Sequence, residues 1–128
     1  PTIDQIAANA AIDIEEQYFH EVLVEYKKRR DIVFDALQSN PDIICKKPRG
    51  AFYIIANLPI EDAEDFVKWL LTDFSIDNET VMVAPAEGFY ATPGLGKNEV
   101  RIAYVLNEEA LAKAMNIFIQ GLAAYQNR

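Results

Sequence analysis

Apolar residues recur along the chain at two spacings, and these spacings predict its elements. Helical spacing, three or four residues apart, begins near residues 2, 13, 59 and 107. Runs rich in β-branched and aromatic residues predict strands at 43–47, 51–57, 80–85 and 98–106. The expected order is helix, helix, strand, strand, helix, strand, strand, helix. This order favours an α+β fold, in which a small, largely antiparallel or mixed β-sheet is covered by helices and preceded by a long N-terminal helical segment.

Polar residues mark where the helices should begin. Residues 2–5 and 13–16 both have the form of a capping box, and at the second one Asp13 caps a new helix or marks a kink. Pro59 opens the third helix, and Asn107 is a suitable N-cap for the last. The expected buried stripes are Phe19, Val22, Leu23, Tyr26, Val33, Phe34 and Leu37 in the second helix, Ala63, Phe66, Val67, Leu70 and Leu71 in the third, and Leu111, Ala114, Met115, Phe118 and Leu122 in the last.

The strand predicted at 98–106 is apolar in its middle except at Arg101. A guanidinium keeps its charge, so a buried one needs a carboxylate or phosphate partner. Ala103 and Val105, which follow on the same face, offer none. The partner must come from elsewhere in the fold, from another chain or domain, or from a ligand. The opposite face is expected to lie in the core, with Val100, Ile102, Tyr104 and Leu106.

Composition narrows the classes of function. The 128 residues suit one domain with a modest core, and the net charge of −8 argues against a nucleic-acid surface. We therefore interpret the basic run at residues 27–29 as a solvated helix face. No apolar run approaches the ~20 residues that cross a membrane. The single cysteine excludes an internal disulfide, so a reducing cytoplasm is the expected compartment.

Three other features carry weak signals for chemistry. Residues 94–97 hint at a phosphate loop, but a Walker motif needs glycine where Ala91 stands. His20 has no second ligand in view, so we expect it at the surface or at the boundary of the core. Cys45 lies beside two lysines that would lower its pKa, yet nothing else marks it as a nucleophile. The residues therefore predict neither a metal site nor a complete active site.

Arg101 is the strongest single candidate for a functional role. Periodicity alone favours a structural arginine at the sheet margin, either stretched toward solvent or paired with Glu87 or another acid. The functional alternative is a carboxylate clamp, because the planar guanidinium binds a carboxylate through two parallel hydrogen bonds.

Four motifs decide between these possibilities by their order and spacing. They are Tyr26-Lys-Lys-Arg-Arg-Asp31, Gly50-Ala-Phe-Tyr53, Val83-Ala-Pro85 and Val100-Arg-Ile-Ala-Tyr104. Together they resemble the class I/II aminotransferases, pyridoxal-phosphate (PLP) enzymes of fold type I. The resemblance covers residues 1–128 and implies the C-terminal small domain of such an enzyme, with residues 1–12 as a helix connecting it to a large domain. It further implies amino-group transfer between an amino acid, of aspartate type, and a 2-oxo acid, with Arg101 binding the substrate α-carboxylate.

The same resemblance implies what this chain lacks. The family's cofactor lysine lies in a segment rich in serine, threonine and glycine, and none of the seven lysines here has that context. The acid for the pyridine nitrogen, the ring-stacking aromatic and most phosphate ligands also belong to the large domain. PLP is therefore expected in a homodimeric parent enzyme, and the chain alone is expected to be inactive. One motif departs from the family, which often has Pro-Gly-Glu-Ala-Phe where this chain has Pro85-Ala-Glu-Gly-Phe89.

Two other hypotheses stay open. The chain also fits a free-standing α+β module that binds a small carboxylate or regulates a partner, with Arg101 as its anchor. A further possibility is a non-catalytic interaction domain that dimerises through the helix at residues 2–11.

Overall fold

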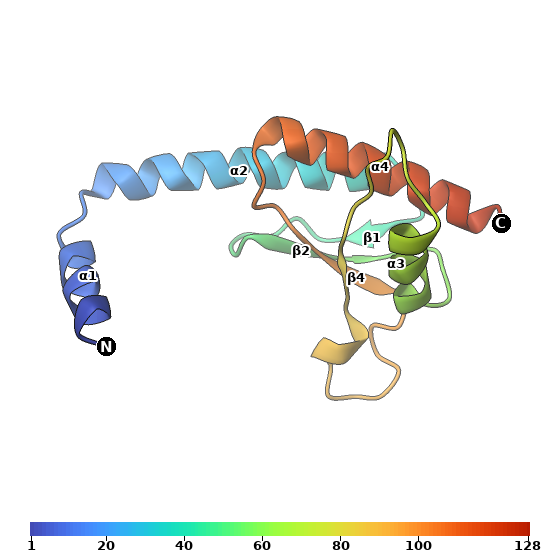
Figure 1. The fold of residues 1–128 in the computed structure, drawn as a ribbon, viewed down its shortest axis with the longest axis horizontal. Helices are drawn as coiled ribbons and strands as arrows, with labels where there is room; N and C mark the ends of the chain where they lie inside the picture. The colour runs from blue at the N-terminus through green and yellow to red at the C-terminus, as the bar shows by residue number, and fades with distance from the viewer.

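The computed structural model describes all 128 residues and confirms the predicted α+β fold class (Figure 1). Helices and strands follow one another in the predicted order, with a short 3-10 helix added before the last strand. The elements are α1 (Thr2–Ile12), α2 (Glu16–Gln38), β1 (Ile44–Cys45), β2 (Tyr53–Asn57), α3 (Ala63–Thr72), β3 (Ala84–Pro85), η1 (Glu87–Phe89), β4 (Glu99–Ala103) and α4 (Glu108–Gln126).

The four strands form one sheet in the order β1-β2-β4-β3, and every neighbouring pair is antiparallel. The predicted pairing of the first two strands is confirmed. All strands are shorter than predicted, because each apolar run in the sequence continues beyond the residues that pair with a neighbouring strand. At 80–85 only Ala84 and Pro85 pair with β4. The long pair β2 and β4 forms the centre of the sheet.

Helices α2 and α4 lie side by side across one face of the sheet, and the core lies between them and the strands (Figure 1). Helix α3 packs against α4 near one end. The face of β4 predicted to be core is buried through Tyr104, but Leu106 is half exposed. Strand β4 ends at Ala103, so the alternation no longer applies three residues later. The buried apolar residues of the main core are Val33, Leu37, Ile43, Ile54, Ala56, Leu58, Ala63, Phe66, Val67, Leu70, Val100, Ile102, Tyr104, Leu111, Met115, Phe118 and Leu122.

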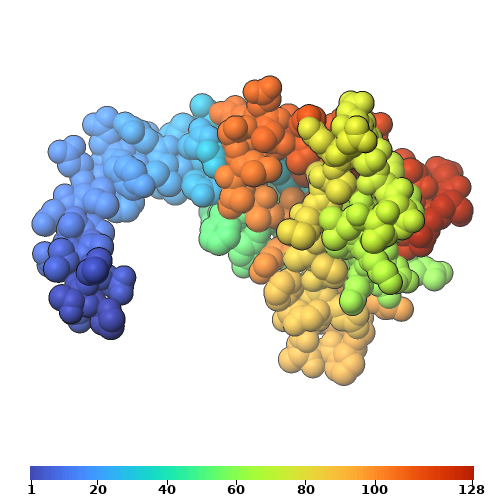
Figure 2. All heavy atoms as spheres, viewed as in Figure 1, coloured from blue at the N-terminus to red at the C-terminus, as the bar shows by residue number.

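The first 24 residues depart most from the predicted core. Helix α1 has no buried residue, and the first turns of α2 project away from the sheet (Figures 1 and 2). Phe19 and Leu23 were expected to be buried, but 50% and 58% of their surfaces are exposed. Helical spacing shows that a face is apolar without showing what covers it. We call residues 1–24 the N-terminal arm; its exposed large apolar residues are Ile3, Ile6, Ile12, Ile14, Tyr18, Phe19, Leu23 and Val24.

The helix starts are partly as predicted. Helix α1 begins at Thr2, but Thr2 makes no capping hydrogen bond, since Pro1 occupies the N-cap position. Asp13 does not cap α2 either: it follows the end of α1, so it marks a break between the two helices. Neither predicted capping box therefore forms its hydrogen bonds, although the first lies at the start of α1 and the second lies at the break between α1 and α2.

Helices α3 and α4 do carry side-chain caps. Helix α3 begins at Ala63 and not at Pro59, because the Asp62 carboxylate accepts the backbone N–H groups of Glu64 at 2.9 Å and Asp65 at 3.2 Å. The Asn107 cap of α4 is confirmed, with its side-chain oxygen 2.8 Å from the N–H of Ala110. The stripes of both helices are buried as predicted except for Leu71, which is half exposed, and Ala114, which is partly exposed.

None of the helices combines the length and the apolar character that a bilayer crossing requires.

Candidate functional site

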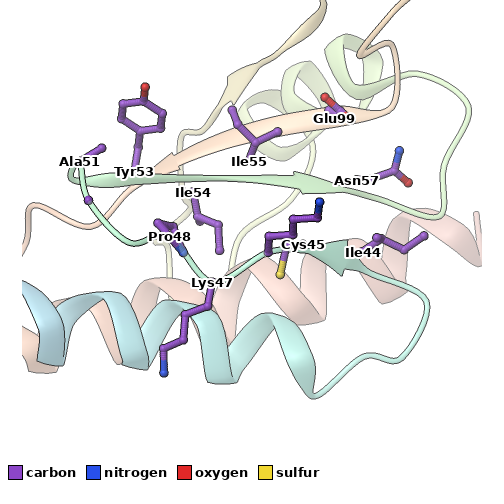
Figure 3. A pocket seen from close by; sticks show the side chains of 12 residues that line it. Ile44, Cys45, Lys47, Pro48, Ala51, Tyr53, Ile54, Ile55, Asn57 and Glu99 are labelled. Carbon is purple, nitrogen blue, oxygen red and sulfur yellow. The ribbon is translucent and has the colours of Figure 1, made fainter.

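Arg101 lies in the middle of β4, where the sheet fixes its backbone on both sides. It pairs with Ile55 of β2 and with Ala84 of β3. Residues that pair across antiparallel strands point to the same face, so Arg101 shares its face with Tyr53 and Ile55. Figure 3 shows Tyr53 and Ile55 on one side of β2 and Ile54 on the other. Arg101 therefore projects from the face that α2 and α4 leave open, where its side chain is half buried.

No internal acid pairs with Arg101. No carboxylate oxygen lies within 4.0 Å of its guanidinium, and its side chain makes no hydrogen bond to the rest of the chain. The hypothesis of a pair with Glu87 is therefore wrong. Glu99, which lies two residues earlier on the same face, was not predicted as a partner of Arg101. The Glu99 carboxylate accepts the hydroxyl of Tyr90 at 2.6 Å, and this hydrogen bond raises the pKa of Tyr90.

Two aromatic rings hold the guanidinium instead. The Arg101 Cζ atom lies 4.3 Å from the ring centre of Phe89 and 5.5 Å from that of Tyr53. Each such contact contributes about 0.5–1 kcal/mol at a partly exposed site. Stacking uses the flat faces of the guanidinium, whereas its N–H donors point outward in its plane. The donors that bind a carboxylate are therefore left free while the group is held in place.

Phe89 reaches Arg101 because of the loop between β3 and β4. The loop begins with the turn η1, in which the N–H of Phe89 donates to the carbonyl of Ala86 at 3.0 Å. This segment was expected only as a connection between the strands predicted at 80–85 and 98–106, so its contact with Arg101 was not predicted. The only signal that could have found it is the position of Phe89 four residues after Pro85 in the motif given above.

A hollow of about 530 Å³ lies beside this face (Figure 3). It opens where the segment after β1 diverges from β2, so that residues 46–51 and the strand do not pair. Arg101 itself does not line it. Tyr53 and Ile55 do line it, so the hollow ends one side chain away from the guanidinium.

The chain offers no lysine suited to holding a cofactor covalently. A Schiff-base lysine must lose its proton near neutral pH, and burial is what lowers its pKa. All seven lysines are exposed, and Glu79 raises the pKa of Lys113 further. No group of three or more histidine, cysteine or acidic side chains is placed to hold a metal ion.

The three weaker candidates are not brought to Arg101. His20 is exposed on α2, as predicted. Cys45 is half buried in β1, and burial raises the pKa of its thiol, contrary to the expected influence of the neighbouring lysines. Gly94 and Gly96 adopt positive φ angles of 77° and 78°, which serve the turns of the loop, while Lys97 lies 3.7 Å from the Asp62 carboxylate.

Comparison with known proteins identifies the family. Residues 1–118 match the family model described as aminotransferase class I and II. The chain belongs to this family. An aspartate aminotransferase from Pyrococcus horikoshii is 36% identical over 116 residues, and an LL-diaminopimelate aminotransferase from Natranaerobius thermophilus is 32% identical over 112 residues. These matches cover 88% and 87% of this chain, but only 28% and 27% of the two relatives.

Solved structures of aminotransferases share the fold. The alanine aminotransferase from Pyrococcus furiosus superposes with a TM-score of 0.76 at 28% identity, covering 94% of this chain and 29% of that one. This aminotransferase chain thus spans less than a third of the length of the relatives it matches. Pyridoxal phosphate is the cofactor of the family, and the residues present here do not supply its lysine.

Proposed function

We propose that residues 1–128 are the C-terminal small domain of a PLP-dependent aminotransferase, in which Arg101 binds the α-carboxylate of the amino acid substrate. The observation that carries this proposal is the unpaired guanidinium on the open face of the sheet, held between Phe89 and Tyr53 with its N–H donors free. A carboxylate matches two parallel N–H donors in geometry and charge.

The relatives support this choice of ligand. By their names they act on aspartate, LL-diaminopimelate and alanine, whose side chains differ in size and charge. All three amino acids share the α-carboxylate, which is the group a single fixed arginine recognises. Arg101 would hold the carboxylate and so restrict the orientation of the α-carbon. Since aspartate aminotransferases are frequent among the relatives, we propose an aspartate-type substrate.

The N-terminal arm supports the assignment to a larger protein. A cluster of exposed isoleucines on α1 is unfavourable in water, and such apolar surface marks a contact with another part of a protein. We assign residues 1–12 to the connection with the large domain. That domain would hold PLP, and the assembled enzyme would be a homodimer. The small domain alone would be inactive.

The test is Arg101→Lys in the longer protein that carries this chain. Lysine keeps the charge but loses the two parallel donors, so KM should rise and kcat/KM should fall by about 30-fold or more. The absorbance of the bound cofactor should not change. Arg128→Lys is a matched control, because Arg128 also stacks on aromatic rings, with Cζ 3.8 Å from the ring centre of Tyr125, far from Arg101 in the fold.

Unchanged kinetics in the Arg101→Lys enzyme would refute the carboxylate role. The alternative of a free-standing carboxylate module is tested separately by calorimetry on the 128-residue chain with a panel of amino acids at low salt. Tight binding there would favour the module over the domain, whereas the proposed domain should bind amino acids only weakly by itself.

A further inference from the structure

A second group of cations lies away from Arg101, where α2 meets the segment that joins β1 to β2. The chain as a whole carries a net charge of −8, yet seven of its twelve lysines and arginines lie within residues 27–30 and 46–49. A local excess of positive charge in an acidic protein creates a site that attracts anions.

Three of these basic residues line one small hollow of about 70 Å³. Lys27 and Arg30 reach it from α2, and Arg49 reaches it from the segment after β1. This hollow lies on the side of the sheet that carries Tyr104 and the helices, so it is separate from the open face of Arg101. Its remaining lining residues are Leu23, Tyr26, Pro48, Gly50, Ala51 and Tyr104.

The positive charge in this hollow is only partly neutralised. Lys27 and Arg49 take part in no ion pair. Arg30 donates to the Asp31 carboxylate at 2.8 Å, and Lys47 contacts the same carboxylate at 2.9 Å. These two cations lower the pKa of Asp31, which is therefore fully ionised but shared between them. Asp31 does not line the hollow, and Glu25 on the same helix is bonded to Arg29.

The backbone beside the cations offers further donors. The N–H groups of Arg49, Gly50 and Ala51 make no hydrogen bond within the chain. The segment is nevertheless held in place, since the buried Tyr104 hydroxyl donates to the Ala51 carbonyl at 3.1 Å and Arg30 donates to the Pro48 carbonyl at 3.2 Å. Because these hydrogen bonds already hold the segment in place, an anion could bind its free N–H groups without a large loss of conformational entropy.

We infer that this hollow binds a phosphate-sized oxyanion, either free phosphate or the phosphate group of a small ester. Its volume admits one tetrahedral group and little more. Three cations suit a dianion better than a singly charged carboxylate, and arginine binds phosphate oxygens through paired N–H donors. Neither the family assignment nor the role of Arg101 requires this site.

The test is calorimetric titration of the 128-residue chain with inorganic phosphate at low ionic strength. We expect one saturable site with a Kd of about 1 mM or tighter. Arg49→Ala and Lys27→Ala should each weaken binding about 10-fold, as the loss of a charged hydrogen bond does. Both side chains are exposed, so both variants should fold, which circular dichroism checks. Arg30 is left unchanged because it also holds the segment.

Lys68→Ala and Arg128→Ala are the matched controls, since each removes one exposed, unpaired cation at the other end of the molecule. They should leave the Kd unchanged. Equal weakening of phosphate binding by all four substitutions would show non-specific attraction and would overturn the site. The site would also be overturned by unchanged binding in Arg49→Ala, by loss of binding only in Arg101→Lys, or by the absence of saturable binding. A parallel titration with glycerol 3-phosphate identifies the source: tighter binding than phosphate indicates an ester, and equal or weaker binding indicates the free anion.

Discussion

At the scale of single residues, Tyr104 links the core to the segment beside the sheet. Its ring is 1% exposed and packs edge-on against Tyr26, with ring centres 6.5 Å apart. Its hydroxyl donates to the carbonyls of Ala51 and Gly50, at 3.1 and 3.4 Å. Burial raises the pKa of this hydroxyl, because ionisation inside the protein would lose hydration.

Tyr104→Phe should therefore lower the free energy of unfolding by about 1–2 kcal/mol near neutral pH, since two carbonyls lose their donor. The pH dependence has a definite sign. The folded protein holds the phenol proton to higher pH than the unfolded chain, so the native protein loses stability as pH rises above 10.0. Phenylalanine has no such proton, and the difference between the two proteins should narrow there. Urea denaturation at pH values on both sides of this pKa measures it; a constant difference would contradict the prediction.

The position of Arg101 could be predicted from sequence, but its surroundings could not. Strand periodicity placed it on the face opposite Val100 and Ile102, and the structure confirms that. Its stacking on Phe89 depends on the conformation of a loop, for which apolar spacing carries no signal. The pair formed by Glu99 and Tyr90 depends on the same loop, which explains why the nearest acid in sequence is not the partner of Arg101.

At the scale of elements, side-chain caps separate the helices that belong to the folded body from those of the arm. Asp62 and Asn107 accept backbone N–H groups at the starts of α3 and α4. Thr2 and Asp13 lie in equally suitable sequences but make no such bonds. A capping-box sequence shows only that the side chains needed for a cap are present. At a helix end without tertiary contacts, ordering these side chains into a cap adds little stability.

Asn107→Ala and Asp62→Ala should each lower the free energy of unfolding by about 1 kcal/mol, because one helix loses the acceptor for its first N–H groups. Thr2→Ala and Asp13→Ala are the controls from the same residue classes, and each should change it by less than about 0.5 kcal/mol. Thermal or chemical unfolding of the four variants tests this. An effect of Thr2→Ala as large as that of Asn107→Ala would mean that α1 is capped and cooperative with the rest of the fold.

Helix α2 shows where element prediction succeeded and where it stopped. Its length, its end before Pro41 and the burial of Val33 and Leu37 follow from the pattern. The exposure of Phe19 and Leu23 does not, because the pattern is the same whether the covering surface lies in this chain or outside it. The sequence thus located the apolar stripe of α2, but two of its seven residues are exposed in this chain.

At the scale of the whole molecule, the arm and the folded body are distinct. The arm projects from the body in Figure 2, and α1 buries no residue against it. A segment without buried apolar contacts contributes little to the cooperative stability of the fold, and its local opening costs little free energy. Its apolar surface is instead available for the interdomain contact proposed above.

Deletion of residues 1–12 should change the free energy of unfolding of the isolated chain by less than about 0.5 kcal/mol, because no buried contact is lost. The same deletion in the longer protein should impair assembly and activity. Chemical denaturation of the short chain and size-exclusion chromatography of the long one are the measurements. A loss of more than about 2 kcal/mol in the short chain would mean that α1 packs on the body in solution.

The sheet ends on both sides in strands of only two residues, β1 and β3, and Pro85 of β3 has no N–H to donate. Growth of one sheet onto another needs a long row of free N–H and C=O groups at an edge. Brief edges of this kind give a neighbouring molecule almost no template. A polypeptide with one uncovered sheet face can therefore avoid fibre formation through its short edge strands.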